Sequence, residues 1–196
     1  MAKKKIIELV INENEDNTGI NAVSVVENPA IEENFIALSK HEVELKEVNA
    51  EKRILMGASL IPNKKIYRKD AQGNEFYIYF SKDTVRKASE LFFMNSNQNN
   101  ATYEHRDKIN GMTVVESWIV DNPEMDKSKE YGFSFPKGTW VISMKVNNDK
   151  VWEDVKLGKV KGFSIEGYFI DKLDLSLVES EEEKQLKEII EILKSI

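Results

Sequence analysis

The sequence predicts an α+β fold: a mainly antiparallel β-barrel or sheet with several helices. Short apolar runs rich in β-branched and aromatic residues recur along the chain, separated by polar or Pro- and Gly-containing turns, which is typical of strands. Apolar residues at helical spacing occur in only a few segments. No internal repeat and no low-complexity segment is present.

The expected strands follow the apolar runs. Asn28-Pro29 ends the second strand, because proline lacks the N–H that a ladder needs. The aromatic run at 76–80 is the strongest strand pattern in the chain. The predicted strands are 6–11, 20–26, 35–38, 76–80, 112–120, 139–146 and 163–170, and 53–61 is a further apolar stretch that ends in a turn at 62–63.

Three segments are expected to be helical. Ser81 is a typical N-cap for a helix over 82–94, with an acidic residue in its first turn. Residues 150–157 are expected to form a short helix that Gly158 stops. Residues 180–196 carry an apolar stripe and an acidic start, as in an amphipathic helix. The segments 39–52 and 121–138 are expected to be connections.

Composition limits the classes of function. The chain has 196 residues, 41% hydrophobic and 32% charged, which suits one globular domain with an appendage. We expect the domain at 1–178 and the helical appendage at 179–196. The net charge of −6 argues against nucleic acid as main partner, and no apolar run is long enough for a membrane span. With two His and no Cys, a structural metal site is not expected.

The candidate chemistry centres on Ser164, which lies between Gly162 and Gly167 in a predicted strand. A serine hydroxyl becomes a nucleophile when a base removes its proton, and the glycines would let a peptide approach the backbone. The alternative is a serine in an ordinary strand with turn glycines. Gly-x-Ser-x-x-Gly is not the nucleophile elbow of the α/β-hydrolases.

His105 is the candidate general base. It lies among charged neighbours at the end of a polar loop, and an unperturbed His pKa of about 6.5 is close to operating pH. The alternative is an exposed surface histidine. The other histidine, His41, lies in a highly charged stretch and is expected to be a surface residue.

The acidic partner is open between two carboxylates. Glu116 lies inside an otherwise apolar strand, where an unpaired carboxylate costs free energy, so it is the first candidate to orient His105. Strand alternation could instead point it to solvent. Glu166 lies two residues beyond Ser164 and shares its strand face, so it is the second candidate.

These motifs, in this order, resemble the prohead (capsid maturation) serine proteases of tailed phages, especially the phage serine protease branch found in prophage-like elements. That family is distantly similar in fold to the herpesvirus assembly proteases. The matching stretches are 22–31, 103–105, 114–120, 138–141 and 162–167.

The resemblance implies a serine endopeptidase with Ser164 as nucleophile and His105 as base, and no cofactor. It would act inside the phage prohead, in the host cytoplasm. Its substrates would be the scaffold and major capsid proteins, and it could form a homo-oligomer. The alternative is a catalytically inactive structural or scaffold-associated capsid protein that keeps the protease fold.

The resemblance also implies that this chain is a circular permutation of the fold of the related capsid proteases. The Val-Ser-x-Val-x-x-Pro-Ala type motif follows the Ser in related capsid proteases, whereas the similar stretch here is N-terminal. A third catalytic residue would then come from near Asn21, where relatives in this branch tend to have Asp. Asn can hold a His by hydrogen bonding but supplies no charge. The turn at 28–31 would then lie near the oxyanion.

The C-terminal helix could pack on the domain or dock on a scaffold or a neighbouring subunit. Proteases of this type also cut themselves, often after Glu. Leu177-Val178-Glu179 is therefore a hypothetical self-cleavage site.

Overall fold

The computed structural model describes residues 4–12, 18–29, 36–37, 52–70 and 72–173. The predicted helix at 180–196, the sequence 177–179 and His41 lie outside these residues. Within them the chain forms three open four-stranded sheets and three α-helices. No helix of the described part is long and apolar enough to cross a membrane.

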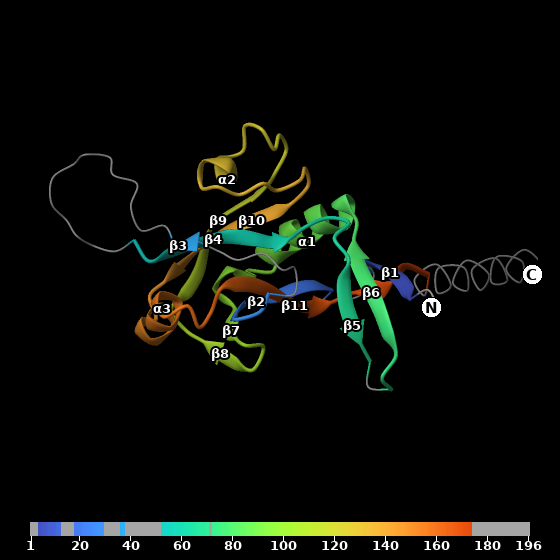
Figure 1. Cartoon of the computed structure of the whole chain (residues 1–196), viewed down its shortest axis with the longest axis horizontal. Coiled ribbons are helices and arrows are strands. Elements are labelled where there is room, and N and C mark those ends of the chain that lie inside the picture. The colour runs from blue at the N-terminus through green and yellow to red at the C-terminus, as the bar shows by residue number, and fades with distance from the viewer. Residues whose placement is uncertain (1–3, 13–17, 30–35, 38–51, 71, 174–196) are drawn as a thin grey trace, which may run out of the picture.

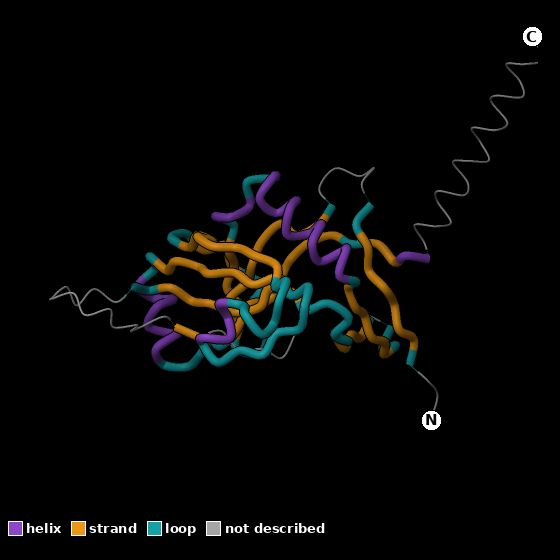
Figure 2. Tube along the Cα trace, turned by 90° about the horizontal axis from the view of Figure 1, so that it is seen from above, coloured by secondary structure: helices purple, strands orange, loops and turns teal. Residues whose placement is uncertain are grey.

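The first sheet, here the β6 sheet, has the strand order β12-β1-β6-β5. Its β1 and β6 are parallel, whereas its other pairs are antiparallel. It lies at the right-hand end of Figure 1, and its strands run across the direction of the other strands in both Figure 1 and Figure 2. The strands are β1 (Lys5–Val10), β5 (Ile66–Lys69), β6 (Glu75–Phe80) and β12 (Ile170–Asp171).

The second sheet, the β10 sheet, has the order β3-β4-β10-β9 and is wholly antiparallel. Its two inner strands, β4 and β10, are almost wholly buried, and β10 carries the fully buried Trp140. The strands are β3 (Ile36–Ala37), β4 (Ile54–Leu60), β9 (Met112–Ile119) and β10 (Trp140–Val146).

The third sheet, the β11 sheet, has the order β11-β2-β7-β8. Strand β2 is antiparallel to β11 and parallel to β7, so it joins segments far apart in the chain. The sheet lies below the β10 sheet in Figure 1. The strands are β2 (Gly19–Val26), β7 (Ala101–Tyr103), β8 (Asp107–Ile109) and β11 (Gly162–Tyr168).

The helices form where local capping groups start them. Ser81 accepts a hydrogen bond from Thr84 N at the start of α1 (Lys82–Met94), and Asn148 accepts one from Val151 N at the start of α3 (Asp149–Lys156). A 3₁₀ turn, η1 (Asn97–Asn99), follows α1, and the short α2 (Lys127–Glu130) lies in the connection between β9 and β10.

Helix α1 covers the sheets with its apolar face and closes the core. It contacts β2 and β10, and its Phe92 ring lies 5.4 Å from the Trp140 ring, at 64°. Val85, Ala88 and Phe92 are fully buried, as the helical spacing predicts. The core thereby ties α1 to two of the three sheets.

Comparison with the predictions gives one correction. The α+β class is confirmed, but the described residues contain no closed barrel, because each sheet keeps two unjoined edges. The pairing of the described strands is mainly antiparallel, as predicted, with β1–β6 and β2–β7 as the parallel pairs. The likeness to herpesvirus assembly proteases and the circular permutation stay predictions.

Candidate active site

Ser164, on the edge strand β11, lies at one end of a row of hydroxyl side chains across the β11 sheet. It pairs with Ser24 of β2, which pairs in turn with Thr102 of β7. Side chains directly opposite one another on neighbouring strands share a face of the sheet. Ser164 is 7% exposed, Ser24 is fully buried and Thr102 is half-buried, so little of the row is accessible to solvent.

Glu166 joins this row to His105. It lies two residues beyond Ser164 on β11 and therefore points to the same face. Its Oε1 lies 3.0 Å from His105 Nδ1 and also accepts a hydrogen bond from the Thr102 hydroxyl. The second of the two predicted acidic partners is thus the one that the fold brings to His105.

His105 sits in a tight turn between β7 and β8 with unusual backbone angles. Glu104 and His105 have φ values of +50° and +56°, and Arg106 N donates to Tyr103 O at 3.0 Å. Positive φ at both central residues is the signature of a type I′ turn, which normally uses Gly, Asn or Asp. Two side chains with Cβ atoms in this region carry conformational strain.

Three hydrogen bonds from the end of β2 hold the strained turn. His105 N donates to Ser24 Oγ at 3.0 Å, Glu104 N donates to Val25 O at 3.2 Å, and Glu27 N donates to Glu104 Oε1 at 2.6 Å. Strained residues persist where the surroundings over-determine them, and they cluster at functional sites. The arrangement fixes the backbone of His105 against β2.

The contact with Glu166 selects a tautomer of His105. An ionised carboxylate only accepts hydrogen bonds, so Nδ1 carries the proton in this contact and neutral His105 keeps its lone pair on Nε2. An imidazole in that state can take a proton from a hydroxyl. Among the described residues no hydrogen bond joins Ser164 Oγ to His105, and the His105 side chain is 42% exposed.

Glu116 lies in a different environment from the one expected. It belongs to β9 of the β10 sheet, where Lys127 Nζ lies 2.7 Å from both of its oxygens and the Ser143 hydroxyl donates to Oε2 at 2.6 Å. Lys127, and then Ser143, lower the pKa of the Glu116 carboxyl below its usual range. The structure does not bring Glu116 to His105.

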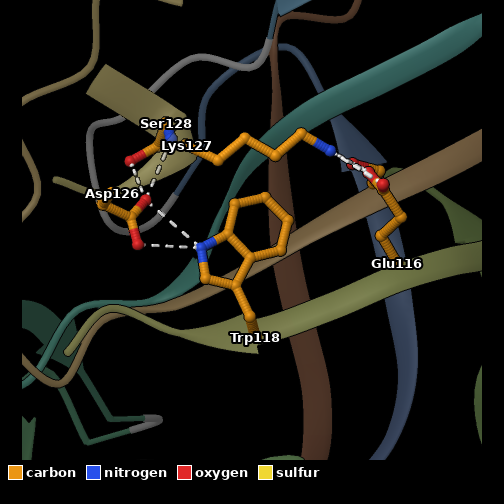
Figure 3. Close-up of polar contacts among 6 residues, drawn as sticks. Glu116, Trp118, Asp126, Lys127 and Ser128 are labelled. Atoms are coloured by element: carbon orange, nitrogen blue, oxygen red, sulfur yellow. Dashed lines mark hydrogen bonds and ion pairs between the residues drawn. The ribbon is translucent and has the colours of Figure 1, made fainter. Parts of the chain in front are cut away.

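Figure 3 shows what Glu116 does instead. The Lys127 side chain passes over the Trp118 ring, 5.4 Å from its centroid, and reaches Glu116. Trp118 Nε1 donates to both oxygens of Asp126, which also caps α2 through Ser128 N. Through Lys127, Glu116 therefore helps to hold the α2 segment against β9. This is a structural role for a carboxylate in an otherwise apolar strand.

Asn21 is also not joined to His105. A register shift between β2 and β11 leaves it unmatched in the ladder between Ala22 and Ile20, and it is exposed. Its carbonyl oxygen accepts a hydrogen bond from Asn100 Nδ2 at 3.2 Å. The turn at 28–31 is described only as far as Pro29.

Ser24, Thr102 and Glu104 were missed as site residues by sequence reasoning. Ser24 lies in the stretch 22–31 that carries the family resemblance, and Glu104 directly precedes His105. Nothing in the local sequence marks these residues as part of a site, because their roles depend on β2 lying between β7 and β11 in the sheet. In the described part of the chain, no group of three or more His, Asp or Glu side chains could hold a metal ion.

Comparison with known proteins gives one family match. The family model described as "Putative phage serine protease XkdF" matches residues 42–171, which include α1, β7 and β11 with His105 and Ser164. No curated protein and no solved structure matches the chain.

Proposed function

This chain belongs to the XkdF family of phage serine proteases, and from that premise we propose that it is a serine endopeptidase with Ser164 as nucleophile and His105 as general base. The observation that carries the proposal is the contact of His105 Nδ1 with Glu166 on the face and strand of Ser164. A nucleophile, a base and a residue that orients the base are the elements of serine-protease chemistry.

The reaction follows from these roles. Ser164 Oγ attacks the scissile carbonyl carbon while its proton passes to Nε2 of His105. The C–N bond breaks as His105 returns that proton to the leaving amine, and water then hydrolyses the acyl-enzyme by the same route. Glu166 stabilises the imidazolium that forms in between. The Ser164–His105 hydrogen bond forms when substrate binds, since catalytic contacts are often loose in the free enzyme.

The proposed substrates are the scaffold and major capsid proteins of the phage, cut during head maturation inside the prohead in the host cytoplasm. Self-cleavage is part of this proposal, as is assembly into a homo-oligomer. Each comes from the resemblance of the sequence motifs to prohead proteases. The reaction as written needs no cofactor.

The test compares wild type, Ser164→Ala and Ser89→Ala. Ser89 is a buried serine on α1 whose hydroxyl donates to Arg86 O at 2.7 Å, so it controls for the loss of a buried hydroxyl. Each protein is incubated with a fluorophosphonate and, separately, with the scaffold protein encoded nearby. We expect labelling and cleavage by wild type and Ser89→Ala only, with the label on the Ser164 peptide by mass spectrometry.

A second candidate is a structural capsid protein that keeps the protease fold without catalysis. It is favoured by the missing hydrogen bond between Ser164 Oγ and His105 in the described residues. If wild type and Ser164→Ala are both folded, both unlabelled and both inert toward the scaffold protein, this candidate replaces the protease.

A further inference from the structure

A pocket of about 200 Å³ lies beside Ser164, where the three sheets meet. Strands β1, β5 and β6 of the β6 sheet line it on one side, and β4 and the edge strand β11 line it on the other. A buried apolar cavity of roughly 150 Å³ can hold benzene. The pocket beside Ser164 therefore has room for a six-membered ring.

The walls suit an aromatic group. Most lining residues are aliphatic or aromatic, and they include Leu60, Ile78, Phe80 and Phe169. The rings of Phe80 and Phe169 meet edge to face, with centroids 4.8 Å apart at 64°. A third ring can join such a pair through further edge-to-face contacts.

One buried hydroxyl in the lining has no partner among the described residues. Ser59 is 1% exposed, and its Oγ makes no hydrogen bond to that part of the chain. The β4–β10 ladder pairs Leu60 with Trp140 and Ala58 with Val141, so Ser59 is the extra residue of a β-bulge. Bulges re-aim side chains, and a buried hydroxyl without a partner is costly unless a ligand supplies one.

We propose that this pocket binds a tyrosine side chain of the peptide that Ser164 attacks, with the phenol hydroxyl bonded to Ser59 Oγ. The ring would occupy the apolar walls, and the hydroxyl would satisfy the buried group. Arg68, the charged residue of the lining, is exposed and already donates from Nη1 to Tyr67 O at 3.0 Å. The assignment of the occupant as substrate rests on the proposed function, because it requires Ser164 to react.

Ligand binding tests the pocket without catalysis. Ser164→Ala protein is titrated with p-cresol and with toluene, and binding is followed by NMR chemical shifts. We expect p-cresol to bind several-fold to about tenfold more tightly than toluene, the gain of one hydrogen bond. Adding Ser59→Ala should abolish that preference, whereas adding Ser89→Ala should preserve it. Equal binding of the two ligands, or no binding, overturns the proposal.

Covalent labelling then tests the link to the reaction. Peptidyl diphenyl phosphonates carry a Tyr, Phe, Leu or Glu side chain beside the phosphorus. Ser164 Oγ forms a bond to phosphorus, a phenoxide leaves, and the Ser164 proton passes to His105 and on to the phenoxide. We expect the Tyr reagent to label wild type fastest, and Ser59→Ala to label at equal rates with Tyr and Phe.

The outcomes separate the two proposals. Labelling of Ser164 without a preference for Tyr, or with a preference for Leu or Glu, overturns the tyrosine pocket and leaves the nucleophile in place. Preferential binding of p-cresol with no labelling by any phosphonate or fluorophosphonate counts against the protease. In that case the pocket binds phenols without serving a reaction.

Stability gives an independent readout of Ser59. If its hydroxyl is unpartnered in the free protein, Ser59→Ala should unfold at the same or a higher urea concentration than wild type. A clear fall in the midpoint, with the slope unchanged, would mean that the hydroxyl is already bonded, and it would remove the reason for assigning a ligand to it.

Discussion

The backbone N–H of His105 donates a hydrogen bond to Ser24 Oγ at 3.0 Å, and this contact ties the turn after β7 to the middle of the β11 sheet. Ser24 Oγ in turn donates to Thr102 O at 3.3 Å. The fully buried hydroxyl therefore uses both its donor and an acceptor position to hold a turn whose backbone is strained.

Ser24→Ala should lower both stability and activity. The change removes the hydroxyl that accepts from His105 N and donates to Thr102 O, which we expect to reduce the free energy of unfolding by about 1–3 kcal/mol. The turn should then place His105 less well and reduce the labelling rate of Ser164. Urea unfolding and fluorophosphonate labelling measure the two effects. Unchanged values in both assays would show that Glu104 and Glu166 hold the turn without Ser24.

Glu166→Gln should reduce the rate of the chemical step by roughly 10²–10⁴-fold, because an amide keeps much of the shape but cannot stabilise the imidazolium. Glu116→Gln is the matched control, since the structure joins Glu116 to Lys127 and Ser143. The measurement is the initial rate of scaffold cleavage at saturating substrate. A large loss with Glu116→Gln and none with Glu166→Gln would restore Glu116 as the acidic partner.

Glu116 should contribute to stability in a pH-dependent way. Its pKa is lowered in the folded protein, chiefly by Lys127, so its contribution is fully present above the unfolded value of about 4.3 and is lost as pH falls through the folded value. At pH 7 we expect Glu116→Gln to cost about 1 kcal/mol, a modest figure because the side chain is 46% exposed. Urea unfolding of both proteins at pH 7 and near pH 3 checks this. The two curves should converge at the lower pH, and an equal gap at both would contradict the linkage.

Gly167→Ala should destabilise the β11 sheet through a steric clash. A Cβ at Gly167 would lie 2.0 Å from the backbone oxygen of Gly19, so β2 and β11 would have to move apart. We expect a loss of about 1–3 kcal/mol, with a fall in labelling because Glu166 is the neighbouring residue. Gly158→Ala is the control, since no described residue lies within 4 Å of an added Cβ and its φ of +68° is what opposes the change. Equal stability of Gly167→Ala and wild type would contradict the close approach.

Helices and strands could be predicted well where a capping residue and the spacing of apolar residues lie within the element itself. The helix over 82–94 was placed with its true bounds by Ser81 and the apolar spacing that follows it. The hairpin of β7 and β8 was missed because its strands have three residues each and its turn uses Glu104 and His105 in place of Gly or Asn. Helix α2 was missed because it is a single turn inside a segment predicted as a loop.

The long-range features could not be predicted in the same way. Whether a sheet closes into a barrel depends on which edges meet, and no residue pattern in one strand states that. For the same reason the local sequence could not decide whether Glu116 or Glu166 lies beside His105. Each occupies a position that suits an acidic partner, and Glu166 contacts His105 because β7 lies in the sheet of β11 rather than in that of β9.

The position of β2 between β7 and β11 has a consequence for biosynthesis. Ser24 pairs with Ser164, which lies 140 residues later, so the face that carries His105 and Glu166 cannot assemble until β11 has left the ribosome. A nascent chain lacking that strand holds the histidine turn without the serine. Under the function proposed above, the order of synthesis alone would keep the growing polypeptide from cleaving other proteins until β11, the last strand of that sheet, docks.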